Sequence, residues 1–340
     1  MLSCTDKRYM KKSVFFTGVL SALLSLTTFS CQMLQQFVES PSLSLKSIGI
    51  KGLDLEGITF NCNYDITNPY PIAFSIKEVA ADILCNGNAF TKIATDQGVN
   101  VAASSTRTNA IDFKITYNSI ITLAQALTGK TESLPFTLKG AAALDLSAIS
   151  SLTNSLSLGF SKDFDVPVFK PEFSLSDVKV NLPSLDSLRT AFTNSGMNII
   201  EAASLAANIV QGKNISASDL QKINLDLDLN FNLNVKNSGN SPWSFLLSKC
   251  SLQTASGTLA GITPLGSTSI SSENGTIPLK ATLNTTQASA FIAQLLNKSG
   301  SNPVFSFDSG LSFPNLSYAP NIPLAYSREI PLSSIGVKRN

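Results

Sequence analysis

The chain has 340 residues, of which 43% are hydrophobic and 14% are charged, and its formal net charge is +2. This composition can fill sizeable cores, and the near-neutral balance without a clustered basic face argues against a nucleic-acid partner. The sequence contains no histidine, which excludes Ser-His-Asp and Cys-His nucleophiles and His-ligated metals. Carboxylate or lysine chemistry stays open, but no residue pair stands out for it. We therefore expect a protein that is not an enzyme and holds no metal or cofactor.

The first thirty residues have the profile of an export signal. Lys7, Arg8, Lys11 and Lys12 precede an apolar run over residues 14–26. That run is too short to cross, as a helix, a hydrocarbon core that is roughly 30 Å thick. A positive segment followed by a short apolar run is typical of secretory signals. We predict a signal peptide over residues 1–30.

The segment that follows the apolar run is Thr28-Phe29-Ser30-Cys31. It resembles the lipobox of bacterial lipoproteins, in which the Cys is acylated and becomes the first mature residue. The resemblance implies lipidation at Cys31, a tether over residues 31–40, and attachment to a membrane of the bacterial cell envelope, the outer membrane being the expected one. Thr28 stands where such boxes favour Leu, so cleavage after Ser30 with plain secretion is the alternative.

Two stretches share one alternation of apolar and polar residues. Residues 58–68 read ITFNCNYDITN, and residues 227–237 read LDLNFNLNVKN. Alternation with period two is typical of half-buried antiparallel strands. Each stretch ends in an Asn, Asn68 or Asn237, followed by turn residues and another apolar strand. We read Asn68 and the Pro that follows as turn-formers, because Asn tolerates unusual dihedral angles and Pro fixes φ.

The agreement between the two halves continues along the chain. Residues 118–127 and 286–296 both have the pattern of a short amphipathic helix, and each is followed by a polar loop and a short apolar run. Several strands, one helix and closing strands predict a β-sandwich with a helix at one edge or end. We place the first sandwich at residues 41–170 and the second at residues 171–335.

The second half also contains an insertion at about residues 182–220. Its apolar residues recur at helical spacing, which predicts two helices broken near residues 194–196 and a third short turn capped by Ser216. One apolar face would contain Ile199, Ala203, Ala206 and Val210. We expect this face to cover an open end of the second sandwich; lining a cavity for an apolar ligand, or docking a partner, are the alternatives.

This plan resembles the late embryogenesis abundant type 2 family, also called the WHy domain (water stress and hypersensitive response). The resemblance lies in a first strand near residues 43–53, in GITFNCNYDITNPYPIAFSI with its Asn-Pro step, in the helix at 118 and in the strand before Gly140. It implies a mainly β protein with two tandem immunoglobulin-like sandwiches and no catalytic centre. The second copy fits less well, because it lacks the Asn-Pro step and holds the helical insertion.

A row of polar residues around the second stretch invites a binding role. Neighbours in the row are about 6.6 Å apart along the strand, so a single strand cannot enclose Ca²⁺, which takes six to eight oxygens. We predict a solvated strand face rather than a calcium site. The row consists of Asn224, Asp226, Asp228, Asn230, Asn232 and Asn234.

The cysteines of an exported protein could form disulfides. If residues 68–71 form a hairpin turn, Cys62 lies opposite about Lys77 and some 26 Å from Cys85. A disulfide needs Cα atoms within about 7 Å. Cys62 and Cys250 align with apolar positions of the other copy, so we predict buried free thiols.

Taken together, these observations predict a non-enzymatic envelope lipoprotein with tandem WHy-like domains. It would act as a stress-protective or protein-interaction module, with an envelope protein as its partner. The alternative is a periplasmic or surface carrier of a lipid or apolar small molecule, bound by the second domain.

Overall fold

The computed structural model describes residues 39–95, 97–127, 130–145, 155–318 and 321–338. The predicted signal peptide, Cys31 and most of the predicted tether lie outside these residues. The described residues form two compact units, one made of those within 1–48, 62–111 and 136–164 and the other of those within 49–61, 112–135 and 165–340. The limits of these units fall inside strands, so the predicted domain boundary between residues 170 and 171 stays a prediction.

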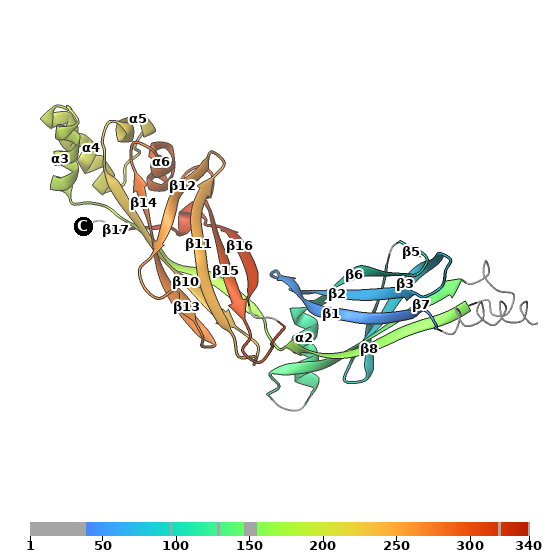
Figure 1. The fold of residues 1–340 in the computed structure, drawn as a ribbon. Coiled ribbons are helices and arrows are strands. Elements are labelled where there is room, and N and C mark those ends of the chain that lie inside the picture. Colours follow the sequence, from blue (N-terminus) through green and yellow to red (C-terminus); the bar gives the residue numbers. More distant parts are fainter. Residues whose placement is uncertain (1–38, 96, 128–129, 146–154, 319–320, 339–340) are drawn as a thin grey trace, which may run out of the picture. The chain divides into compact units, whose positions relative to one another are not determined.

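The fold is mainly β, as predicted, and its first half is built from two sheets (Figure 1). The strands are β1 (Ser42–Leu53), β2 (Gly57–Asn68), β3 (Phe74–Cys85), β4 (Asn88–Ala94), β5 (Val99–Val101), β6 (Ser105–Thr116), β7 (Ser133–Asp145) and β8 (Ser155–Pro167). One sheet has the order β1-β2-β6; the other has the order β4-β3-β7-β8, with β5 paired to β3.

The two sheets of the first half share one apolar core. Strand β2 alternates as predicted: Ile58, Phe60, Cys62, Tyr64 and Ile66 are buried and the residues between them are half-exposed. Because side chains alternate across a strand, such a sheet has one apolar face. A single cluster joins β2 of the first sheet to β3, β5, β7 and β8 of the second. The first half is therefore a two-layer sandwich.

The second half forms a nine-stranded sheet. Its strands are β9 (Pro171–Asn181), β10 (Asp226–Asn237), β11 (Ser244–Thr254), β12 (Gly257–Pro264), β13 (Ser269–Ile270), β14 (Asn274–Asn284), β15 (Val304–Ser312), β16 (Ile322–Glu329) and β17 (Gly336–Lys338). Their order is β16-β15-β11-β12-β14-β10-β9-β17, with β13 paired to β11. Strand β17 is parallel to β9.

Aromatic side chains fill the interior of the second half. Phe231 of β10 meets Phe305 of β15 with ring centroids 5.4 Å apart. Phe173 of β9 lies 5.1 Å from Phe307 and 5.2 Å from Tyr326. Because these pairs join strands that are distant in the sheet order, the sheet folds over on itself and encloses its core.

The two halves have the same order of strands. The order β1-β2-β6 recurs as β9-β10-β14, and β4-β3-β7-β8 recurs as β12-β11-β15-β16. The short strand β5 pairs with the start of β3 as β13 pairs with the start of β11. A register shift follows Ile76 in β3 and Leu247 in β11, and each of these residues stands two places after the Phe that lies at the start of its strand.

The Asn that ends β2 and the Asn that ends β10 hold their turns in the same way. Asn68 donates from Nδ2 to the backbone oxygen of Ile72 (2.8 Å), and its Oδ1 accepts the N–H of Tyr70 (3.0 Å). Asn237 donates to the backbone oxygen of Ser241 (3.0 Å) and accepts from Gly239 (2.8 Å). Neither Asn has a positive φ, so the side-chain amide, rather than an unusual backbone angle, makes these residues turn-formers.

The hairpin assumed for residues 68–71 was wrong. Strands β2 and β3 lie in different sheets, so this turn crosses from one layer to the other. Cys62 and Cys85 are nevertheless buried free thiols, as predicted, whereas Cys250 is only partly buried.

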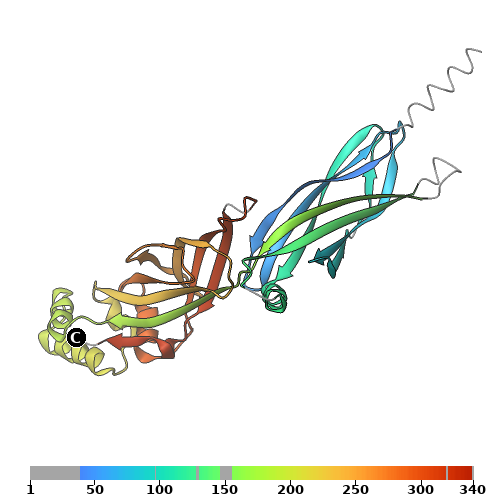
Figure 2. The ribbon, with the colours of Figure 1, turned by 90° about the horizontal axis from the view of Figure 1, so that it is seen from below.

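The predicted helices are present. The short helix of each half is present as α2 (Tyr117–Ala126) and α6 (Ser289–Asn297). The insertion forms α3 (Leu185–Asn194), α4 (Ile199–Gln211) and α5 (Ala217–Gln221). A 3-10 turn, η1 (Leu332–Ser334), lies near the C-terminus. Ser184, Asn198 and Ser216 cap α3, α4 and α5 with their side chains. Figures 1 and 2 place α3, α4 and α5 together at one end of the C-terminal sheet. Within the described ranges, no helix has both the length and the apolar character needed to cross a bilayer.

Candidate functional site

The polar row on β10 is linked to the strands on both sides of it. Asn232 donates to Asp177 of β9 (3.0 Å), and Asn234 donates to Ser176 (3.0 Å). On the other side Asp228 accepts from Thr282 of β14 (3.0 Å) and lies 3.6 Å from the Lys280 ammonium. The residues of the row are half-buried or exposed, and no group of three acidic or Cys side chains in the described residues is arranged to hold a metal ion. The row is a solvated, hydrogen-bonded strand face, as predicted.

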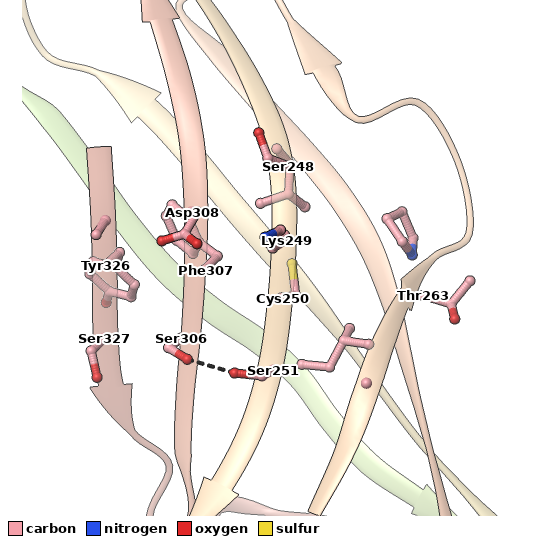
Figure 3. Close-up of a pocket in the computed structure, with 15 residues that line it drawn as sticks. Ser248, Lys249, Cys250, Ser251, Thr263, Ser306, Phe307, Asp308, Tyr326 and Ser327 are labelled. Atoms are coloured by element: carbon pink, nitrogen blue, oxygen red, sulfur yellow. Dashed lines mark hydrogen bonds between the residues drawn. The ribbon is translucent and has the colours of Figure 1, made fainter. Parts of the chain in front are cut away.

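A groove of about 790 Å³ lies on the C-terminal sheet, where β11, β12, β15 and β16 meet. Its floor contains Leu247, Phe307 and Tyr326, which are almost fully buried. Its walls contain short polar and charged side chains, which Figure 3 shows on neighbouring strands. The labelled polar ones are Ser248, Lys249, Cys250, Ser251, Thr263, Ser306, Asp308 and Ser327.

The groove exists because β12 leaves one layer of the sheet for the other. Near its start β12 pairs with β11, from Gly257 to Gly261. From Ile262 to Pro264 it pairs with β14 instead. The two strands therefore diverge, and the space between them is the groove. A Gly and a Pro inside a strand often mark such bends, so Gly261 and Pro264 are the sequence signal for this site.

The polar groups of the groove are largely uncommitted. Ser251 and Ser306 share a hydrogen bond of 2.8 Å across β11 and β15. Lys249 and Asp308 face each other in the register of the same two strands, yet among the described residues neither side chain has a hydrogen bond or ion pair. On the β9-β10-β14 face, by contrast, Lys236 and Lys280 have acidic partners at 3.8 and 3.6 Å.

The thiol in the groove is unsuited to nucleophilic chemistry. Burial, and secondarily the charge of Asp308, raise the pKa of Cys250 to about 11. A reactive Cys needs the thiolate, which positive surroundings favour and apolar ones disfavour. Cys250 is therefore a neutral thiol at neutral pH.

The four residues predicted to form an apolar ligand face do not lie together on one buried face. Ala206 is buried, Ala203 and Val210 are half-buried, and Ile199 is 77% exposed. Helix α4 buries Ala202, Ala206 and Ile209 instead, a stripe shifted round the helix from the predicted one. None of the four residues lines the groove described above or two smaller grooves among the described residues of this half. A ligand role for them stays a prediction.

Comparison with known proteins gives one family. Residues 63–157 match the family model of late embryogenesis abundant proteins, LEA_2. No curated protein matches the sequence.

Solved structures give weaker similarities. The solution structure of AT1g01470 from Arabidopsis thaliana is 16% identical with a TM-score of 0.31, covering 38% of this chain and 82% of that one. The putative late embryogenesis abundant protein At2g46140.1 is 12% identical with a TM-score of 0.30, covering 46% and 88%. Spo0M, a sporulation control protein from Bacillus subtilis, is 5% identical with a TM-score of 0.23, covering 86% and 91%. At these TM-scores the similarities carry no argument about function.

The family match, by contrast, runs from within β2 to the start of β8. It supports a stress-related protein similar to the late embryogenesis abundant proteins. The resemblance predicted from the sequence is therefore confirmed over residues 63–157, where the chain matches the late embryogenesis abundant protein family.

Proposed function

We propose that this protein is a non-enzymatic lipoprotein of the bacterial cell envelope, anchored through Cys31, whose two halves are tandem copies of the late embryogenesis abundant type 2 fold. The copies act as a stress-protective module through contacts with an envelope protein. The family match over residues 63–157 carries the proposal. Two parts of the proposal go beyond the matched residues: that the second half is a copy of the same fold, and that Cys31 anchors the chain to a membrane.

Three features support the extension to the second half. The strand orders agree in both layers. The register shift after Ile76 has its counterpart after Leu247. The buried amides of Asn68 and Asn237 make the same pair of local hydrogen bonds. A side-chain bond to the residue two places on and another to the residue four places on is a specific device, and its recurrence at the end of equivalent strands favours duplication over convergence.

The alternative of a carrier that uses the α4 face has less support. It needs a cavity lined by Ile199, Ala203, Ala206 and Val210, and three grooves found among the described residues of this half are lined by residues of other elements. Apolar ligands bind in concave sites that bury most of their surface, and an exposed Ile199 supplies no such enclosure.

Metabolic labelling with an alkyne fatty acid tests the anchor. The full chain would be expressed in a bacterial host as wild type, as Cys31→Ser and as Cys4→Ser, the last as a matched control inside the predicted signal peptide. We expect label and membrane attachment in the wild type and in Cys4→Ser, and neither in Cys31→Ser. A wild type without label, or a labelled Cys31→Ser protein, would overturn anchoring through Cys31. Firm attachment is expected because a lipoprotein carries several acyl chains, each contributing about 0.8 kcal/mol per buried CH₂.

A further inference from the structure

The groove lies where the pairing of β12 departs from that of its counterpart β4 in the first half. In the first half the equivalent strands stay joined beyond the ladder: the N–H of Val79 donates to Thr95 Oγ1 (3.1 Å), and the N–H of Thr95 donates back to the Val79 carbonyl (2.9 Å). In the second half Cys250 stands three residues after Leu247, as Val79 stands three residues after Ile76, and there β12 turns away to β14. The groove therefore results from a local difference between the halves: β12 changes its pairing partner from β11 to β14, whereas β4 pairs with β3.

The groove presents donors and acceptors in balance. Within the described residues, the side chains of Lys249, Asp308, Ser248, Thr263 and Ser327 make no hydrogen bond to protein. They come from β11, β12, β15 and β16 and line one hollow. One cation, one anion and several hydroxyls suit a ligand that is uncharged overall and both donates and accepts hydrogen bonds. A polyanion such as a nucleic acid or phosphate chain would be repelled by Asp308 and could form an ion pair with only one lining residue, Lys249.

Two other ligand classes fit less well. An acyl chain needs a cavity that encloses most of its surface. This groove is open, its apolar residues Ile262, Pro264 and Ala325 stand among charged and hydroxyl side chains, and Leu247, Phe307 and Tyr326 are only 5%, 3% and 8% exposed. An extended peptide needs a free strand edge. The edge of β11 is already used by β13 at Phe245–Leu246 and by β12 from Ser251 onward, which leaves too short a stretch for a paired strand.

We propose that this groove binds a neutral carbohydrate chain, with Asp308 accepting from sugar hydroxyls, Lys249 donating to them, and the Ser and Thr hydroxyls of the walls completing the contacts. Its volume of about 790 Å³ lies within the roughly 300–1,000 Å³ of small-molecule sites. The proposal does not depend on lipidation or on stress protection. It gives the protein a second kind of contact in the envelope, with glycan rather than with membrane.

Titration calorimetry on the full chain carrying Cys31→Ser tests the proposal. The probes are cellotetraose, maltotetraose and chitotetraose, with myristate and an uncharged decapeptide as the competing ligand classes. We expect at least one oligosaccharide to bind with a Kd in the millimolar range or tighter. Asp308→Ala should weaken it about tenfold or more, because a hydrogen bond to a charged group is lost. Asp228→Ala, which removes a carboxylate of β10 that does not line the groove, should change it less than about twofold.

A second pair of variants separates groove occupancy from folding. A Cβ at Gly261 would meet no atom within 4 Å, and the same is true at Gly49 on β1. Gly261→Trp therefore adds a bulky side chain at a residue that lines the groove, where its Cβ meets no neighbour, and Gly49→Trp is the matched control. Loss of binding in Gly261→Trp but not in Gly49→Trp supports the site. Binding that survives both Asp308→Ala and Gly261→Trp, no oligosaccharide binding at all, or binding of myristate or the peptide alone would overturn it.

Discussion

Replacing Asn237 by Ala should destabilise the second half selectively. Asn237 is 4% exposed, and its amide makes three hydrogen bonds to backbone: it accepts from Lys170 (3.2 Å) and Gly239 (2.8 Å) and donates to Ser241 (3.0 Å). At about 1 kcal/mol for each bond, with buried partners left unsatisfied, the loss should be about 3 kcal/mol. For a unit of this size that corresponds to a melting temperature lower by roughly 6–12 °C.

The single tryptophan makes the effect measurable. Trp243 is 3% exposed, and its indole N–H donates to the Ser272 carbonyl (3.1 Å), so its fluorescence reports unfolding of the second half. We would compare urea unfolding of the wild type, Asn237→Ala and a control, Asn232→Ala, whose half-buried amide donates a hydrogen bond to Asp177. The control should lose less than about 1 kcal/mol. Equal losses in the two variants would refute the role given to the buried amide.

Three further predictions concern packing, capping and pH. Gly239→Ala should cost about 3 kcal/mol or more, because its Cβ would lie 1.9 Å from the Val168 carbonyl oxygen; a melting temperature within 1 °C of wild type, by calorimetry, would contradict this. Asn198→Ala removes the cap that accepts the Glu201 N–H (2.9 Å) and should cost about 1 kcal/mol, seen as faster amide exchange in the first turn of α4; unchanged exchange there would refute it. Burial raises the pKa of the Cys62 thiol from 9.0 to about 11. The unfolded thiol therefore ionises first, and the free energy of unfolding should fall as pH rises from 9 to 11. Cys62→Val should flatten that fall in urea titrations, and an equal slope in both proteins would count against a buried neutral thiol.

Local patterns predicted most of the elements. Strand β2 and strand β10 follow the period-two alternation residue by residue, because each has one face in the core and one in water. The insertion helices α3 and α4 follow the helical spacing, and their caps Ser184 and Asn198 stand just before the first turn. These features depend on neighbours in the sequence, so the sequence alone suffices for them.

The pairing of strands depends on distant residues, and there the sequence was less informative. Asn68 and the Pro that follows announce a turn, but nothing local says whether the next strand pairs with β2 or crosses to the other layer, as β3 does. The groove is a case of the same kind, because it depends on β12 exchanging β11 for β14. Gly261 and Pro264 indicate a bend in β12, but a bend alone does not predict which strand β12 pairs with beyond it.

The candidate site was missed for a related reason. Cys250 aligns with a core residue of the first copy, so the alignment predicts a buried thiol. Its partial exposure results from the departure of β12, which no pattern around Cys250 encodes. The exposed Ile199 has a simpler cause: it is the first residue of α4, where the chain enters the helix from a loop and one side lacks a packing partner.

The most direct test of the proposed function is survival after drying. Bacteria that lack the protein would be complemented with the wild type, with Cys31→Ser, or with Cys4→Ser at matched expression levels, then dried, rehydrated and counted. The proposed anchored, stress-protective role predicts that survival falls without the protein, is restored by the wild type and by Cys4→Ser, and is not restored by Cys31→Ser. Equal survival with and without the protein would contradict protection, and full rescue by Cys31→Ser would contradict the need for the anchor.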